Sequence, residues 1–153
     1  MIDLTYTTWI IAIFGIITFV PLFVAQLFML FKPHSQATKD LIIGKGEVWR
    51  DMSHFKSALA FAWADWLIIF PLLVLSYAGD FMGEMWGYLL WLALGILSIY
   101  FSIVFWVAEK EYVFPSCGWI AYYTYIWGFF LYWGIVAIIY SIIQLFNNLS
   151  VGG

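Results

Sequence analysis

Four long apolar stretches constrain this chain more than any other feature of its 153 residues. They cover about residues 8–31, 57–78, 85–108 and 116–146. Each is longer than the roughly 20 residues that a helix needs to cross the hydrocarbon core of a bilayer. In lipid a helix satisfies its own backbone hydrogen bonds, and these stretches lack the alternation of barrel strands. The sequence therefore predicts an all-α fold, an integral membrane antiparallel bundle of four transmembrane helices forming one domain over 1–153.

The composition also indicates a membrane protein. Only 10% of the residues are charged, whereas a soluble domain carries about 25%, so there are too few charges to cover a water-facing surface. The net charge is −3 and most basic residues lie beside acids. Because nucleic-acid binding needs a basic patch, we expect no nucleic-acid partner. The single cysteine, Cys117, excludes an intrachain disulfide. The partner that the composition predicts is the lipid bilayer.

The six basic residues fall in two places and set the expected topology. Five lie between the first and second stretches, at Lys32, Lys39, Lys45, Arg50 and Lys56, and Lys110 lies between the third and fourth. Basic residues of short loops stay on the cytoplasmic side of a membrane. We therefore expect the loops 32–56 and 109–115 to be cytoplasmic and both termini to lie outside, which is an N-out/C-out topology. A tight outer turn over 77–80 then places Asp80 among the outer charges.

The second helix is expected to begin before its apolar stretch. Gly44 and Gly46 interrupt the first loop, and residues 47–56 then read as helix without a break. The predicted helix therefore runs over about 47–78, with a water-exposed cytoplasmic extension of about two to three turns. A proline inside a helix removes one backbone donor, so we also expect bends at Pro21 and Pro71.

Asp65 is the most unusual residue of the second stretch, because a charge inside a membrane costs several kcal/mol unless it is paired or hydrated. Counting residues from the cytoplasmic end of each stretch places one polar group of every helix at about the depth of Asp65. The other groups are Gln26, Ser102 and the pair Tyr122 and Tyr125. Two interpretations stay open, which are simple hydrogen bonding between helices and a pocket with a polar floor and aromatic walls.

The pocket interpretation predicts a specific set of residues. The ligand-binding residues would be Asp65, Gln26, Ser102, Tyr122, Tyr125, Trp63 and Trp66, and Arg50, His54 and Glu109 would frame a mouth at the cytoplasmic side. Asp65 would anchor the polar end of the ligand. Concave, mostly apolar sites with a few convergent polar groups are the usual form of a small-molecule site. A lipid or another apolar ligand suits such a pocket, and the sequence identifies no cofactor.

We expect no resident metal ion, although four residues are candidates for one. These are Glu47, Asp51, His54 and Glu109. On a continuous helix the first three are spaced four and three residues apart and share one face. One histidine with several carboxylates is a donor set for Zn²⁺ or Fe²⁺. Charged residues on a cytoplasmic extension are more often simply solvated, and we prefer that interpretation.

The sequence thus leads to a first functional interpretation and three alternatives. The first is a membrane protein that binds a hydrophobic or amphipathic small molecule in the cytoplasmic half of its bundle. The second is an oligomeric proton- or ion-coupled transporter or channel that uses Asp65. The third is a membrane-embedded enzyme acting on a lipid or isoprenoid, with Asp51, His54 and Glu109 at its mouth. The fourth is an accessory subunit of a membrane complex.

Overall fold

The computed structural model describes residues 5–117 and 128–151, with side chains for 5–107 and 128–148. The described elements are all helical: α1 (Tyr6–Phe31), α2 (Gln36–Ile42), α3 (Met52–Ala64), the π-helix η1 (Asp65–Ile69), α4 (Phe70–Phe81), α5 (Met85–Cys117) and α7 (Phe129–Val151). Four segments are long and apolar enough to cross a membrane, which are Tyr6–Phe31, Met52–Phe81, Met85–Val107 and Phe129–Asn148. The prediction of an all-α chain with four such segments is confirmed.

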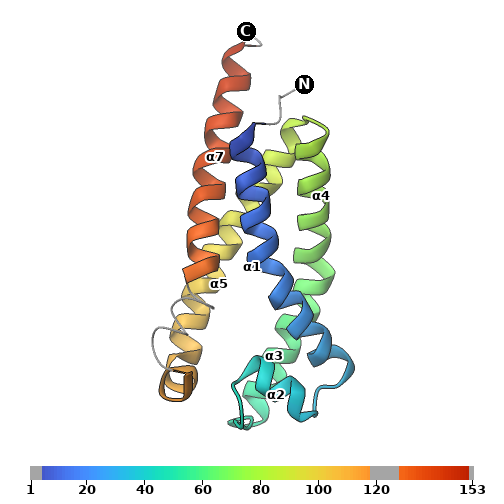
Figure 1. The fold of residues 1–153 in the computed structure, drawn as a ribbon, viewed down its shortest axis with the longest axis vertical. Helices are drawn as coiled ribbons and strands as arrows, with labels where there is room; N and C mark the ends of the chain where they lie inside the picture. Colours follow the sequence, from blue (N-terminus) through green and yellow to red (C-terminus); the bar gives the residue numbers. More distant parts are fainter. Residues whose placement is uncertain (1–4, 118–127, 152–153) are drawn as a thin grey trace.

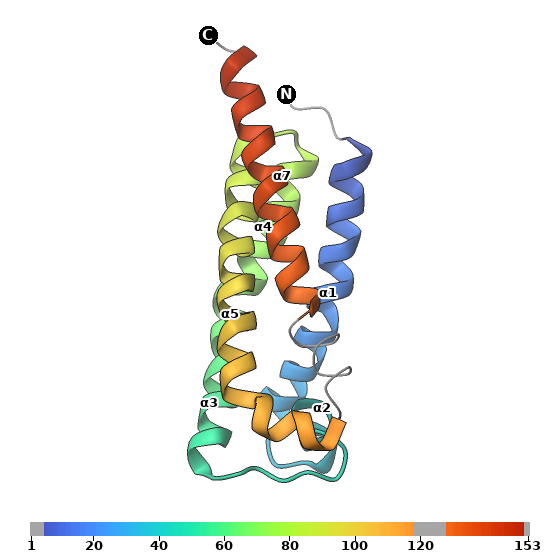
Figure 2. The ribbon, with the colours of Figure 1, turned by 90° about the vertical axis from the view of Figure 1, so that its left-hand side faces the viewer.

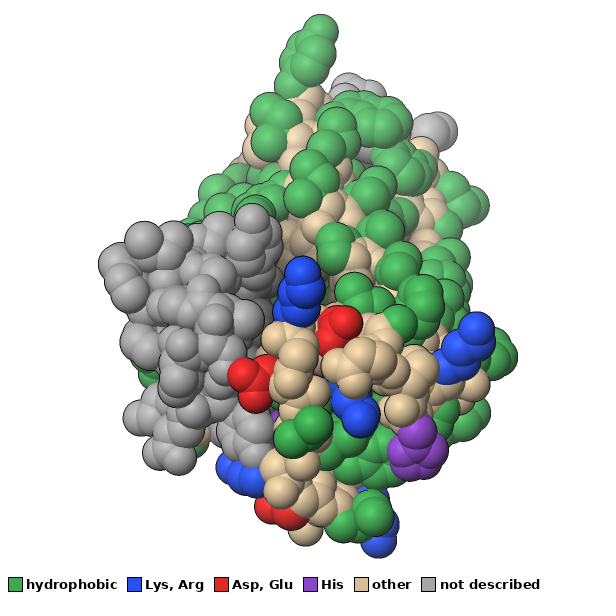
Figure 3. All heavy atoms as spheres, turned by 60° about the horizontal axis from the view of Figure 1, so that its bottom comes forward, with side chains coloured by type: hydrophobic (Ala, Val, Ile, Leu, Met, Phe, Trp, Pro, Cys, Tyr) green, Lys and Arg blue, Asp and Glu red, His purple; other side chains and the backbone are tan. Residues whose placement is uncertain are grey.

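The four long segments form a bundle in which each lies beside the next along the chain (Figure 1). α5 packs along both α4 and α7, and α1 closes the ring by contacting α3, α4 and α7. Both ends of the chain lie at one end of the bundle, which we call the terminal end, and α2 lies at the opposite end, the loop end. Figure 3 views the loop end, where charged side chains gather, while hydrophobic side chains cover much of the described surface beyond it.

Aromatic side chains fill much of the core between the helices. Phe19 of α1 contacts Phe130 and Trp133 of α7 edge to face, with ring centroids 5.3 and 5.0 Å apart. Two polar tips of core residues donate to neighbouring carbonyls of α1: Trp133 Nε1 to Ile11 O at 3.2 Å and Tyr77 Oη to Ala12 O at 2.9 Å. In a medium without water, such bonds between helices add to van der Waals packing. They hold α4 and α7 against the same turn of α1.

Glycines allow α5 to approach both of its neighbours closely. A Cβ added to Gly134 of α7 would lie 2.7 Å from the carbonyl oxygen of Gly95 in α5. A Cβ added to Gly79 of α4 would lie 2.7 Å from the Cα of Gly87 in α5. Small residues at the contact are the usual means by which membrane helices bring their backbones together. Both crossings would have to open to admit a larger side chain.

The second long apolar segment differs from the prediction at both ends. It begins at Met52 and not near residue 47, because the Asp51 side chain accepts the His54 backbone N–H at 2.8 Å and caps the helix. The expected helical extension over 47–51 is therefore wrong. At its far end the segment continues to Phe81, and Gly83, with a φ of 70°, makes the turn. Asp80, expected among the outer charges, is instead part of the helix and 1% exposed.

The third and fourth helices also have different bounds from those expected. α5 continues as helix to Cys117, so the predicted turn over 109–115 is helical in its backbone. Charged residues such as those at 109–111 are good helix formers and do not by themselves end a helix. Figure 2 shows the loop-end part of α5 turning away from the line of the rest of the helix. α7 begins at Phe129 and ends at Val151, and the predicted start near residue 116 is wrong because 116 and 117 belong to α5.

The short helix α2 was not predicted. Ser35 caps it through the Thr38 backbone N–H at 3.2 Å, which is a common start signal in sequences. The Thr38 side chain is completely buried and donates to the carbonyls of Phe28 at 3.1 Å and Lys32 at 2.7 Å. These bonds attach α2 to the last turn of α1. The first part of the loop is therefore a folded element held against the bundle.

Candidate functional site

The predicted partnership between Asp65 and Gln26 is present. Gln26 Nε2 of α1 donates to Asp65 Oδ2, and both residues are 4% exposed. The second carboxylate oxygen of Asp65, Oδ1, and the amide oxygen of Gln26, Oε1, are buried and have no hydrogen-bond partner among the described residues. A buried polar atom without a partner costs free energy. The pair therefore keeps capacity for one further donor at the carboxylate.

Asp65 occupies the first position of a widened helical turn. In η1 the Phe70 backbone N–H donates to Asp65 O, five residues earlier, where an α-helix would bond four residues earlier. Pro71 follows directly and has no N–H to donate, so the predicted disturbance of the helix falls in the turn before this proline. Single π turns inside α-helices frequently occur at functional sites. This turn places the Asp65 carboxylate inside the bundle, about 20 Å along the segment from Met52.

A cavity of about 20 Å³ lies beside Asp65. Its walls come from α1, η1, α5 and α7, and apart from Asp65 and Ser98 they are apolar: Phe19, Leu22, Ile69, Leu94, Leu97, Phe101, Phe105 and Phe130. Ser98 is 3% exposed and its Oγ has no hydrogen-bond partner among the described side chains. A space of this size holds about one water molecule. The site is thus a carboxylate and a hydroxyl in an otherwise apolar chamber.

The other residues of the predicted ligand-binding set are placed differently. Ser102 is buried, but its Oγ donates to Ser98 O at 2.8 Å within its own helix, and Ser98 takes its place in the cavity wall. Trp66 packs on Phe23 and Phe70 outside the cavity. Trp63 is 52% exposed on the outer surface of the bundle, so it does not form a wall. Residues two apart on a helix point to opposite sides, which is why Asp65 and Trp63 do not face the same space.

Two predicted wall residues and one mouth residue lie outside what is described. Tyr122 and Tyr125 fall within 118–127, and the side chain of Glu109 falls in the part of α5 described by its backbone alone. The aromatic walls that are described come from phenylalanines of α1, α5 and α7. Sequence reasoning missed these residues because it selected aromatic residues with polar tips, whereas the chamber is lined by rings without them.

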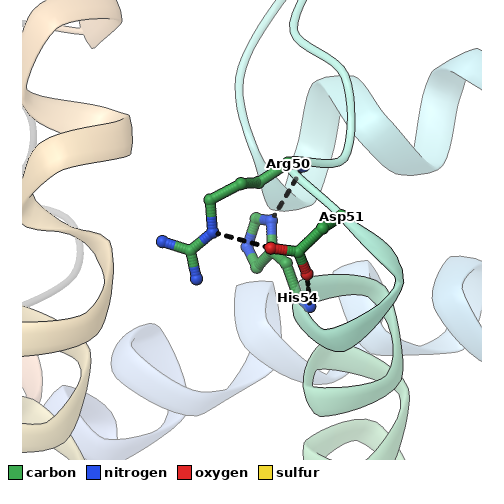
Figure 4. A network of polar contacts seen from close by, with 3 residues as sticks. All are labelled: Arg50, Asp51 and His54. Atoms are coloured by element: carbon green, nitrogen blue, oxygen red, sulfur yellow. Dashed lines mark hydrogen bonds and ion pairs between the residues drawn. The ribbon is translucent and has the colours of Figure 1, made fainter.

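Arg50 and His54 form a compact network at the start of α3 (Figure 4). Arg50 Nε lies 3.4 Å from Asp51 Oδ2, and the Arg50 backbone N–H donates to His54 Nδ1 at 3.4 Å. The His54 and Trp49 rings are 5.3 Å apart, edge to face. Asp51 is held as an anion: the backbone N–H of His54 above all, with Arg50 contributing, lowers its pKa below the usual 3.8. These contacts define a helix start at the loop end.

The proposed metal-ligand spacing is not realised. Glu47 lies in a non-helical segment, so it does not share a helical face with Asp51 and His54. Asp51 is used as the cap of α3, and His54 Nδ1 accepts a backbone N–H. Among the side chains that are described, no group of three or more His, Cys, Asp or Glu residues is arranged to hold a metal ion.

A second buried polar cluster lies at the terminal end and was not predicted. Its centre is Asp80 of α4, whose two carboxylate oxygens are buried without a hydrogen-bond partner among the described residues. The Tyr88 and Trp91 side chains of α5 are both completely buried nearby in the same corner, with ring centroids 6.1 Å apart. The sequence signal was Asp80 itself, which was misplaced by ending the helix three residues early.

Comparisons of the chain with protein-family models, with curated protein sequences and with solved structures find no match. The function is therefore argued from the geometry of the two buried carboxylates.

Proposed function

We propose that this is a multi-pass membrane protein that binds an amphipathic small molecule between its four helices, with Asp65 holding the polar end of the ligand. The observation that carries this proposal is the unpartnered Asp65 oxygen beside an apolar chamber lined by all four segments. A carboxylate prefers a cationic or strongly donating group, and hydrogen bonds to charged groups contribute about 1.5–3 kcal/mol. The ligand class is therefore an amine or another donor carrying a narrow apolar group.

The chamber sets a condition on how such a ligand enters. At about 20 Å³ it admits one water-sized group, whereas sites for larger ligands measure roughly 300–1,000 Å³. The rings of Phe101, Phe105 and Phe130 are partly buried at its wall. Rotation of these side chains, which lie toward the outside of the bundle, would enlarge the chamber without breaking a backbone hydrogen bond. The apolar part of the ligand would then replace their contacts with its own.

The test is binding of a fluorescent cationic amphiphile to the full chain in lipid nanodiscs. Asp65→Asn removes the charge but keeps the shape, and we expect it to weaken binding about tenfold or more. Ser98→Leu fills the chamber and should weaken binding to a similar degree while leaving the carboxylate in place. Trp63→Phe, on the exposed surface, is the matched control and should bind as the wild type does.

Two results would contradict the proposal. One is unchanged affinity in both Asp65→Asn and Ser98→Leu, which would place the probe elsewhere. The other is equal affinity for an anionic amphiphile of the same length, since a carboxylate would repel it. If neither result is found, mass spectrometry of molecules that copurify with the protein would identify the natural ligand.

A second candidate function is proton or ion coupling through Asp65, and the π turn favours it. The widened turn at η1 and the absent donor of Pro71 leave this part of the helix with a less regular hydrogen-bond pattern than its neighbours, and such turns are suited to local rearrangement. Four helices enclose little space, so this function would need an oligomer. Asp65→Asn should then abolish pH-driven flux in proteoliposomes, and unchanged flux would eliminate the coupling role.

The orientation in the membrane is also a proposal. It is supported by the gathering of the basic side chains at the loop end and of both termini at the other end (Figures 1 and 3). We propose that the loop end is cytoplasmic and that the terminal end lies outside. In a Cys117→Ser background, a cysteine at Glu84 should react with a membrane-impermeant reagent applied to intact cells, whereas one at Lys45 should not. The reverse labelling pattern would show that the loop end lies outside and the terminal end is cytoplasmic.

The enzyme and accessory-subunit interpretations gain no separate support from the described residues. Asp51 and His54, which were proposed for the enzyme, are used in the start of α3, and the side chain of Glu109 lies outside what the structure describes. A homo-oligomer or a partner in a membrane complex remains compatible with the exposed apolar walls of the bundle.

A further inference from the structure

Among the described residues, Asp80 has no partner for its charge. The residue is 1% exposed, and neither oxygen accepts a hydrogen bond from a described residue. The sequence holds no basic residue between Lys56 and Lys110 or after Lys110. Lys56 and Lys110 themselves lie toward the loop end, away from Asp80. A buried ionised carboxylate without a partner is strongly disfavoured. No group in the described part of the chain balances the charge of an ionised Asp80.

The corner around Asp80 is tightly closed. The carboxylate lies over Gly87, where an added Cβ would be 2.5 Å from Asp80 Oδ1. The ionisable groups around it are Tyr77 on its own helix and Tyr88 on α5, both within its electrostatic range, while Glu84 in the adjoining turn is exposed. α1 carries no charged residue over its length. A carboxylate this confined suits the smallest cation, a proton, better than a metal ion with its coordination shell.

Hydroxyl groups lie between this corner and the surface of the terminal end. Tyr88 Oη is buried without a hydrogen-bond partner among the described residues, and the Tyr88 ring lies 5.9 Å from the ring of Tyr140 in α7. Tyr140 Oη lies 2.6 Å from Thr8 Oγ1, which is completely buried, and 2.7 Å from Thr5 Oγ1, which belongs to an exposed residue. Thr5 and Thr8 are themselves 3.1 Å apart. Three mutually bonded hydroxyls thus lead from the interior to the surface.

We propose that Asp80 is a proton-binding site. It exchanges its proton with the water at the surface of the terminal end through the hydroxyl groups of Tyr88, Tyr140, Thr8 and Thr5. Each hydroxyl donates one hydrogen and accepts another, so a proton arriving at one oxygen is matched by release of a proton from the next, and no oxidant or co-reactant is needed. The site lies fifteen residues from Asp65 on the same span, about 22 Å away. It does not depend on ligand binding at Asp65.

The experiment is infrared difference spectroscopy of the full chain in lipid nanodiscs across a pH series. We expect a protonated-carboxyl band that disappears in Asp80→Asn and persists in Glu84→Gln, the exposed carboxylate of the same corner. In deuterated buffer, exchange of this band should slow about tenfold or more in Tyr140→Phe. Tyr100→Phe, which removes an exposed hydroxyl from α5, is the matched control and should exchange as the wild type does.

Three results would overturn the proposal. They are the lack of any protonated-carboxyl band that depends on Asp80, exchange as fast in Tyr140→Phe as in the wild type, and a band that responds to sodium or potassium at constant pH. If Asp80→Asn fails to fold, the exchange measurement in Tyr140→Phe still decides, since Asp80 is intact there. Repeating the series in Asp65→Asn separates the two sites, because loss of ligand binding there leaves the Asp80 band unchanged.

Discussion

The loop half and the terminal half of the bundle each bury one carboxylate of the same membrane span, and they surround it in different ways. At the loop half, Asp65 has a partner in Gln26 and an apolar chamber at its side. At the terminal half, Asp80 has no described partner and lies against the close crossing of α4 and α5 at Gly79 and Gly87. Space is therefore available beside the paired acid and is missing beside the unpaired one. The comparison suggests a site for a molecule in one half and for a proton in the other.

Adding side-chain volume should give the largest difference in stability between the two halves of the bundle. Gly87→Val places a side chain where Asp80 and the backbone of Gly79 already lie, and we expect it to destabilise the protein by about 3 kcal/mol. Ser98→Leu, which adds two side-chain heavy atoms beside the chamber where Gly87→Val adds three, should be tolerated. Thermal unfolding in detergent measures both. Equal losses in the two variants would show that the halves are packed alike.

Breaking the Asp65 pair should have the next largest effect. Gln26→Leu leaves the carboxylate buried without its donor, which should cost about 2 kcal/mol. Adding Asp65→Leu should recover most of that loss, because replacing both partners by apolar groups removes the unsatisfied atom. The pair of single variants and the double variant form a cycle measured by unfolding. Additive losses would mean that the two side chains do not interact.

Neutralising Asp80 should act in the opposite direction. Since its carboxyl group makes no hydrogen bond to a described residue, Asp80→Asn removes a group that can ionise in the interior without removing a bond. We expect the variant to be as stable as the wild type or more stable by about 1 kcal/mol, whereas Asp65→Asn should not gain stability. Unfolding of the two variants side by side decides this. A clear loss in Asp80→Asn would reveal a partner for the carboxylate.

Acid should loosen the start of α3 and leave both halves of the bundle largely unaffected. The folded-state pKa of Asp51 is lowered by the His54 backbone N–H, so its contribution is complete above the ordinary pKa of 3.8 and is lost as the pH falls through the lower folded-state value. Hydrogen exchange of the first turn of α3 should rise a few-fold in that range. Asp51→Asn keeps a capping oxygen without a titrating charge and should show no such rise. A pH response of equal size in Asp51→Asn would assign it to another group.

The sequence was sufficient for the number of spans and for the meeting of Gln26 with Asp65, because both follow from apolar length and helical depth. It was insufficient where helix ends depend on local bonds, as at Asp51, and on a glycine turn, as at Gly83. That error hid Asp80, which a helix ending at residue 78 would have left in a loop. The choice of Trp63 contradicted helical periodicity and was avoidable. The widened turn at η1 and the anchoring of α2 by Thr38 depend on tertiary contacts that residue spacing does not show.

The bonds from Trp133 and Tyr77 to adjacent carbonyls of α1 bear on the order in which the protein is assembled. α1 is synthesised before α7, yet its Ile11 carbonyl receives its indole donor from Trp133 of that later helix. Thr5 and Thr8 likewise bond to Tyr140 of that span. A nascent chain halted before α7 would thus hold an open arrangement of three helices with one side of α1 facing lipid. The ring can close only after α7 has been synthesised, so termination before α7 should leave a product that quality-control proteases can recognise.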